Sequence, residues 1–111
     1  MTNKYLITYI CNSGFASRAM DEARKAGARG GTILHGKSSL DASNQTFFGI
    51  TINPEKDVLL IIANEDQKQG ILNAINETYG VKTEARGILF TLVVDKTVGI
   101  NLERKFGEEN D

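Results

Sequence analysis

The sequence predicts a single domain of the α+β class. Its 111 residues suit one hydrophobic core and leave no room for a second. Hydrophobic residues at 41% and charged residues at 24% are typical of a folded protein. Two segments of helical periodicity alternate with segments that have the two-residue period of strands. We assign residues 1–103 to this domain and expect a flexible tail over residues 104–111.

The first half of the chain predicts a strand, a helix and a second strand. Residues 4–10 alternate between two faces and are rich in strand-forming side chains. Residues 15–26 are helix formers with a stripe of alanines, and Gly27 stands where a glycine can close the helix. Residues 32–34 predict a short strand, and the small polar residues of 36–45 predict a long loop.

Two further strands are predicted before the second helix. Residues 47–52 and 57–63 have strand-like composition, and Pro54 lies between them, where its missing backbone donor favours a turn or bulge. Residues 58–62 are continuously apolar, so this strand is expected to be buried on both faces.

The second half closes with a helix and a strand. Asn64 and Gln67 have the spacing of a capping box at a helix start, and Gly80 ends the helix. Residues 87–94 predict the last strong strand, and residues 98–100 a short extra one.

The resulting order is β-α-β-β-α-β, the split βαβ or ferredoxin-like arrangement. It predicts one antiparallel sheet with both helices on one face. No helix remains to cover the other face, although the predicted strands carry apolar residues on both sides. We expect self-association to cover it.

The charge and residue content exclude several kinds of function. A net charge of -1 gives no broad attraction for nucleic acid. No run of about 18 apolar residues predicts a membrane span, and the first residues lack the features of a signal peptide, so we expect a cytoplasmic protein. Cys11 and His35 are the only cysteine and histidine, too few for a zinc site, and we predict no metal site.

Residues 31–38, Gly-Thr-Ile-Leu-His-Gly-Lys-Ser, have the spacing of a phosphate-binding P-loop. A working P-loop needs a strand before its first glycine and a helix beginning at its lysine. Here a helix precedes the motif, its middle is strand-like, and a loop follows, so we reject a nucleoside triphosphatase. His35, Gly36 and Lys37 still lie at a loop mouth, where they either hold an anion or are simply solvated.

Five short segments spread along the chain form a second pattern. They are GARGGTILHG at 27–36, FFGI at 47–50, PEK at 54–56, RGILFTL at 86–92 and VDK at 94–96. Together they cover nearly the whole chain, and in this order the sequence resembles the PII nitrogen-regulatory superfamily, its short PII-like branch more than the archetype.

This resemblance implies a homotrimeric regulatory protein that is not an enzyme. Members bind adenine nucleotides between subunits, and a long loop after the second strand reports the ligand to a transporter or metabolic enzyme, often in nitrogen metabolism. By position, Thr32 matches the threonine that contacts adenine, and Gly36 lies near the glycine that opens the reporter loop. Arg86 and Gly87 match the phosphate-binding loop. The expected effector is ATP, ADP, AMP or cyclic AMP, with no tightly bound cofactor.

The chain also departs from the family pattern at three cationic positions. Ile88 stands where a phosphate-binding lysine is expected, and Gly99 and Asn101 stand where two arginines are expected. Loss of three charge-assisted contacts should weaken or redirect triphosphate binding. Arg86 and Lys37 could partly replace them and favour a less charged nucleotide.

Three alternatives remain open at this point. An enzyme of the same fold would use Cys11, His35 or Asp95, but their spacing gives no nucleophile, base and orienting group. A trimeric cation-tolerance protein would need more metal-binding side chains. A degenerate member would serve only as a scaffold.

Overall fold

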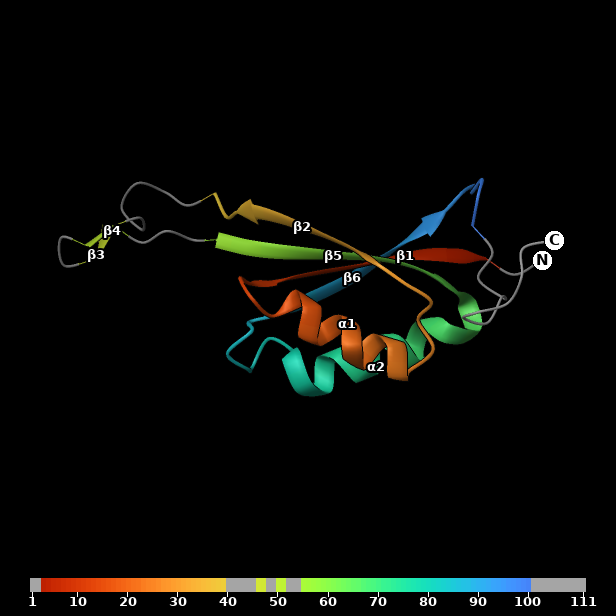
Figure 1. The fold of residues 1–111 in the computed structure, drawn as a ribbon, viewed down its shortest axis with the longest axis horizontal. Helices are drawn as coiled ribbons and strands as arrows, with labels where there is room; N and C mark the ends of the chain where they lie inside the picture. Colours follow the sequence, from red (N-terminus) through yellow and green to blue (C-terminus); the bar gives the residue numbers. More distant parts are fainter. Residues whose placement is uncertain (1–2, 40–45, 48–49, 52–54, 101–111) are drawn as a thin grey trace.

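Four antiparallel strands form the main sheet of the computed structural model, which describes residues 3–39, 46–47, 50–51 and 55–100. The elements in chain order are β1 (Lys4–Asn12), α1 (Ala16–Lys25), β2 (Thr32–Lys37), β3 (Thr46–Phe47), β4 (Ile50–Thr51), β5 (Glu55–Asn64), α2 (Glu65–Tyr79) and β6 (Ile88–Val94). The sheet has the order β2-β5-β1-β6, and both helices cover one of its faces (Figure 1). The predicted ferredoxin-like fold is confirmed.

The core lies between the sheet and the two helices. Alternate residues of β1 and β5 point toward the helices, and Ile7, Tyr9 and Leu59 are completely buried. Ile71 and Ile75 of α2 are also completely buried. Each such aliphatic side chain contributes about 1.5–3 kcal/mol through the hydrophobic effect. On α1 the buried residues are mostly alanines, which let this helix pack close to the strands.

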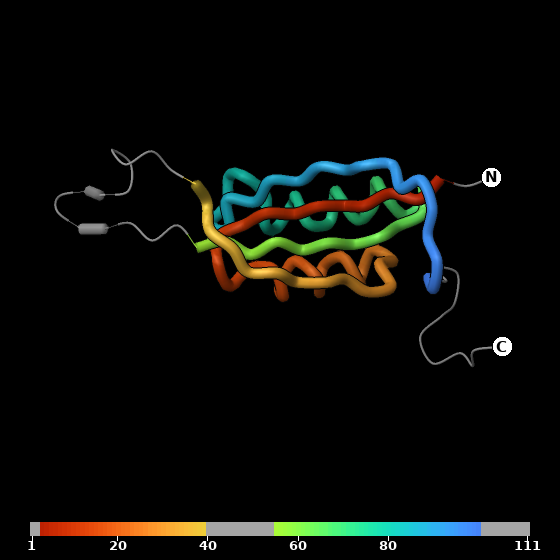
Figure 2. Tube along the Cα trace, turned by 90° about the horizontal axis from the view of Figure 1, so that it is seen from above, coloured from red at the N-terminus to blue at the C-terminus, as the bar shows by residue number. Residues whose placement is uncertain are grey.

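The opposite face of the sheet carries a second set of apolar side chains. The strand register places Leu34, Leu60 and Phe90 together on this open face with Leu92. Leu34 is 49% exposed, Phe90 43% and Leu92 54%. Figure 2 views this face and shows no helix in front of it. The apolar alternation expected from the sequence is therefore present, and most of one face lacks cover within the chain.

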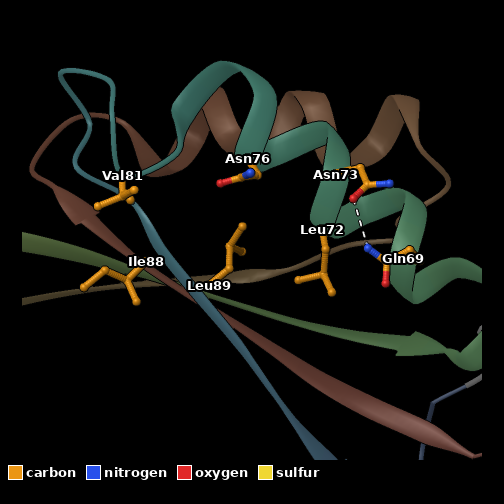
Figure 3. Close-up of a pocket in the computed structure, with 8 residues that line it drawn as sticks. Gln69, Leu72, Asn73, Asn76, Val81, Ile88 and Leu89 are labelled. Atoms are coloured by element: carbon orange, nitrogen blue, oxygen red, sulfur yellow. Dashed lines mark hydrogen bonds between the residues drawn. The ribbon is translucent and has the colours of Figure 1, made fainter.

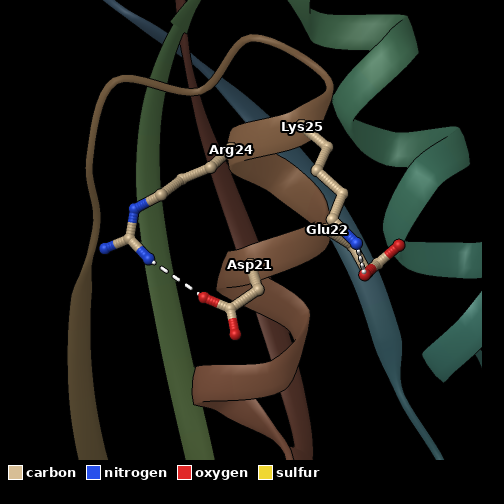
Figure 4. Close-up of polar contacts among 4 residues, drawn as sticks. All are labelled: Asp21, Glu22, Arg24 and Lys25. Atoms are coloured by element: carbon tan, nitrogen blue, oxygen red, sulfur yellow. Dashed lines mark hydrogen bonds and ion pairs between the residues drawn. The ribbon is translucent and has the colours of Figure 1, made fainter. Parts of the chain in front are cut away.

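Helix α2 begins as its sequence predicts. The backbone N–H of Asn64 donates to Gln67 Oε1 at 2.9 Å, as in a capping box. On α1, exposed ion pairs join Asp21 to Arg24 at 3.2 Å and Glu22 to Lys25 at 3.1 Å (Figure 4). Such pairs contribute only about 0.2–0.5 kcal/mol each, so they support the helix without forming a site.

Three predicted boundaries are wrong. Gly36 and Lys37 belong to β2 rather than to the loop, because β5 begins at Glu55 and pairs with them. Residues 47–52 are not one strand, because Phe47 of β3 pairs with Ile50 of β4 in a separate hairpin. Residues 98–100 form no strand, because Gly99 has φ +91°, which strand geometry does not allow. Pro54, residues 40–45 and the expected tail lie outside the described residues.

Candidate ligand-binding site

Thr32 lies in a surface hollow at the start of β2. The segment after β6 crosses the end of the sheet to reach this place (Figure 2). The hollow has a volume of about 330 Å³. Three separate parts of the chain line it, namely Arg29, Gly30, Gly31, Thr32, Leu60, Ile62, Gly99 and Ile100.

This hollow combines one cation with apolar surface. Arg29 is exposed and is the one cationic side chain among the described residues that line it. Leu60, Ile62 and Ile100 supply apolar contact, and Thr32 adds a hydroxyl group. Such a lining suits a ligand with a flat, weakly polar part and one anionic group.

Gly31 packs closely against its neighbours and does not lie in a phosphate-binding loop. A Cβ atom there would lie 2.8 Å from Met20 Sδ and 3.0 Å from Leu59 Cδ1, so both side chains would have to shift to make room for it. The remaining positions of the P-loop pattern continue along β2 instead of forming a loop before a helix. The rejection of a P-loop is confirmed.

His35 is held by a buried carboxylate near the other end of β2. Its Nδ1 lies 2.8 Å from Asp57 Oδ1, and since an ionised carboxylate only accepts, Nδ1–H is the donor. Asp57 is 3% exposed and also accepts from the Gly14 N–H at 2.9 Å. Burial opposes ionisation of Asp57, but hydrogen bonds from His35, Gly14 and the Ala16 N–H outweigh it and hold its pKa below the usual 3.8.

Gly36 and Lys37 follow His35 on this edge strand. Gly36 pairs with Lys56 of β5, which pairs in turn with Asn12 of β1, so the three residues form a row across the sheet. A Cβ atom at Gly36 would meet nothing within 4 Å, and its φ is not positive. Packing within the chain therefore does not require a glycine here.

Arg86 and Gly87 lie in the loop that joins α2 to β6. Arg86 has φ +49°, the left-handed region that side chains rarely adopt, and its side chain is exposed. A Cβ atom at Gly87 would collide with the Tyr79 carbonyl oxygen and the Tyr9 ring. The Gly87 N–H donates to the Gly80 carbonyl at 3.1 Å. Gly87 is thus closely packed, whereas the neighbouring Arg86 is exposed.

The predicted site residues fall into two groups on opposite edges of the sheet. Residues 32–37 lie on β2 and residues 86–87 precede β6, with β5 and β1 between them. Neighbouring strands are about 4.8 Å apart, so the edges are separated by roughly 14 Å. The chain brings His35, Gly36 and Lys37 together and joins Arg86 to Gly87, but it does not bring the two groups to one small ligand.

A second hollow of about 440 Å³ lies between α2 and β6. Its lining is Gln69, Leu72, Asn73, Asn76, Val81, Gly87, Ile88 and Leu89 (Figure 3). Gln69 Nε2 donates to Asn73 Oδ1 at 2.9 Å, so part of its polar surface is already satisfied. The lining has amide and apolar groups and no charged side chain among the described residues, so this hollow does not suit an anion.

The described residues give no support to a cysteine enzyme or a metal site. Cys11 is 1% exposed, and burial is the main cause that raises the pKa of its thiol, which makes it a poor nucleophile. No group of three or more potential metal ligands occurs within the described ranges. Neither helix in that part of the chain is long and apolar enough to cross a membrane.

The fold and the arrangement of the sheet are those of PII-type signalling proteins. The chain has a TM-score of 0.63 with each of three solved structures. A putative PII-like signalling protein of Thermus thermophilus is 21% identical, over 83% of this chain and 86% of that one. PII of Arabidopsis thaliana, bound to citrate, is 22% identical, over 84% and 78%.

GlnK of B. subtilis is 13% identical, over 86% of this chain and 89% of that one. At these identities the likeness is one of fold, and the resemblance seen in the sequence is confirmed at that level. No protein-family model and no curated protein sequence matches the chain.

Sequence reasoning missed three residues that the structure places at these positions. Arg29 stands beside two glycines in the segment that carries the resemblance, and this placement could have marked it as a cation near Thr32. Asp57 is a charged residue on the inward-facing side of a buried strand, a pattern that indicates a fixed partner. Asn12 gave no signal, because its side chain binds Glu84 and Lys56, which lie far along the chain.

Proposed function

We propose that this protein is a cytoplasmic PII-type regulator that forms a homotrimer, binds a small anionic effector between subunits, and controls a transporter or an enzyme, without catalysis of its own. The observation that carries the proposal is the separation of the two groups of site residues on opposite sheet edges. Adjacent copies could bring residues 86–87 of one chain to residues 32–37 of the next. The apolar open face offers surface for such an assembly.

The effector we favour is an adenine nucleotide of low charge, AMP or cyclic AMP rather than ATP. Arg29 in the hollow and Arg86 on the loop offer two cations, and Ile88 cannot supply a third. A triphosphate needs more charge-assisted contacts than two arginines provide. The citrate bound to Arabidopsis PII is a small organic anion held by a protein of this fold, which supports the choice of an anionic effector.

The test is thermal unfolding of the full chain with AMP, cyclic AMP, ADP, ATP and citrate in turn. A ligand present at about 100 times its dissociation constant should add about 2.7 kcal/mol to the free energy of unfolding. We expect AMP or cyclic AMP to raise the melting temperature more than ATP does. If none of the nucleotides raises the melting temperature, the proposed adenine-nucleotide effector is wrong.

Two variants locate the site. Arg29→Ala and Arg86→Ala should each weaken the apparent affinity about tenfold or more, since a hydrogen bond to a charged group contributes about 1.5–3 kcal/mol. Arg24→Ala is the matched control, because Arg24 is an exposed arginine that pairs with Asp21 and does not line the hollow. A shift unchanged by both variants would place the ligand elsewhere.

A further inference from the structure

Asn12, the last residue of β1, contacts the loop before β6. Asn12 Nδ2 donates to the Glu84 carbonyl oxygen at 2.8 Å. The backbone N–H of Asn12 donates to the Ala85 carbonyl oxygen, also at 2.8 Å. Both carbonyls immediately precede Arg86 and Gly87. The position of this loop is therefore tied directly to Asn12.

The same side chain contacts the start of β5. Lys56 Nζ donates to Asn12 Oδ1 at 2.7 Å. Lys56 is the second residue of β5, which begins where the connection from β2 ends. The amide nitrogen of Asn12 donates to one segment, and its amide oxygen accepts from another that is far away in the sequence. The two atoms are not interchangeable, because the oxygen can only accept and the nitrogen can only donate.

A second contact ties the turn that follows Asn12 to both strands that flank this connection. The Gly14 N–H donates to Asp57, and Asp57 also binds His35 of β2. The turn at residues 12–14 is therefore linked to the end of β2, to the start of β5 and to the loop before β6.

We propose that Asn12 is a positioning residue that couples the loop at residues 84–87 to the start of β5, so that an effector held by this loop also restricts the first residues of β5. The coupling rests on the function proposed above. An effector that contacts the exposed Arg86 reduces the motion of the Glu84 and Ala85 carbonyls beside it, and the bonds of Asn12 pass this restriction on to Lys56. Because such coupling is reciprocal, a partner that fixes the start of β5 strengthens effector binding.

The first test needs no effector and uses hydrogen exchange measured by mass spectrometry on the full chain. Asn12→Ala should speed exchange at residues 83–87 and at residues 55–57, each on the order of fivefold, as expected for the loss of one hydrogen bond. Asn12→Asp keeps an acceptor for Lys56 and loses the donor to Glu84, so it should speed exchange only at residues 83–87. Asn73→Ala, on the exposed side of α2, should change neither segment.

The proposal fails if Asn12→Ala alters only one of the two segments, or if Asn12→Asp alters both equally. Far-UV circular dichroism checks that each variant is folded, and the comparison with Asn12→Asp still decides the matter if the alanine variant is not. This result does not depend on any effector.

A second test adds AMP at a concentration that saturates the thermal shift. In the natural sequence AMP should slow exchange at residues 55–57. In Asn12→Ala it should still slow exchange at residues 83–87 but leave residues 55–57 unchanged. Protection of both segments in the variant would overturn the coupling. If AMP shifts nothing in the natural sequence, the proposed effector fails, and the effector-free test still decides the role of Asn12.

Discussion

Asp57 supplies from another strand what the first helix lacks in its own sequence. Phe15 occupies the N-cap position of α1 and makes no side-chain capping bond. The Asp57 carboxylate instead accepts from the Gly14 and Ala16 N–H groups while it holds His35. A single buried charge thereby joins β2, β5 and the start of α1, and it is stabilised because each of its neighbours donates to it.

The pKa of Asp57 makes stability depend on pH in a defined direction. Its pKa is lowered in the folded state, so its contribution is present above pH 3.8 and is lost as the pH falls through the folded-state value. Asp57→Asn should therefore lower stability at pH 7 by about 1–3 kcal/mol and flatten the loss of stability below about pH 4. Urea unfolding across the acidic range up to neutral pH measures both effects.

Asp21→Asn is the control for this prediction, because Asp21 is exposed and forms only a surface pair with Arg24. It should leave the pH profile close to that of the natural sequence. A profile for Asp57→Asn as steep as that of the natural sequence would refute the assignment.

Position 87 requires glycine because its neighbours leave no room for a side chain, not because of its backbone angles. The Tyr9 hydroxyl donates to the Tyr79 carbonyl at 2.7 Å, and both groups lie against the Gly87 α-carbon. Gly87→Ala should lower the free energy of unfolding by about 1–3 kcal/mol, as for other overpacked sites. Gly30→Ala should have little effect, because nothing lies within 4 Å of a Cβ atom there. Urea unfolding of the two variants distinguishes them, and equal stabilities would contradict the packing argument.

At the scale of elements, local patterns predict both helices and the four strands of the main sheet. The alternation of residues 4–10 and the helical spacing of Ile71 and Ile75 are properties of short segments. These patterns determine which side chains of each element pack in the core. The wrong boundaries lie where pairing with another strand, and not the local sequence, determines whether a segment is a strand. The end of β2 is a strand only because β5 offers it a partner, and the β3–β4 hairpin exists because those residues pair with each other.

The candidate site is less predictable for the same reason. Thr32 is identified through the resemblance, and the hollow around it depends on Ile100, which comes close only when the chain crosses the sheet end. Asn12 binds a group 72 residues away along the chain, and Asp57 binds one 43 residues away. No pattern of local spacing contains such contacts.

The capping box of α2 gives a prediction at the scale of one element. Gln67 accepts from the Asn64 N–H, and its Nε2 donates to the Gly27 carbonyl at 3.3 Å, so it also joins α2 to the end of α1. Gln67→Ala should lower stability by about 1 kcal/mol. Gln69→Ala, which removes only an exposed contact with Asn73, should cost clearly less. Thermal unfolding compares them, and an equal loss would argue against the cap.

At the scale of the whole molecule, the open face of the sheet has no covering layer among the described residues. Apolar side chains from all four strands lie on it, whereas the helix side is buried. A single chain of this size gains stability mainly from one core, so a second apolar face favours association between copies. This is why the proposed assembly and the proposed site depend on each other.

Phe90→Glu tests the proposed assembly. A charge near the middle of the open face should convert a trimer into single chains, because a carboxylate buried without a partner is strongly unfavourable. Light scattering after size-exclusion chromatography measures the mass. Val81→Glu is the control, because Val81 is apolar and 55% exposed but lies outside the sheet. A natural chain that elutes as one subunit would contradict the trimer itself.

The crossing of the segment after β6 has one more consequence. Because the hollow is lined both by Arg29, soon after the first helix, and by Ile100, beyond the last strand, an occupant that contacts both would act as a reversible cross-link. Most of the chain lies between these two residues. The hollow therefore exists only after folding has brought them together, and the occupant binds the folded chain and not the unfolded one. Bound effector would then protect the domain as a whole against unfolding, and a protease would detect it even at sites far from the hollow.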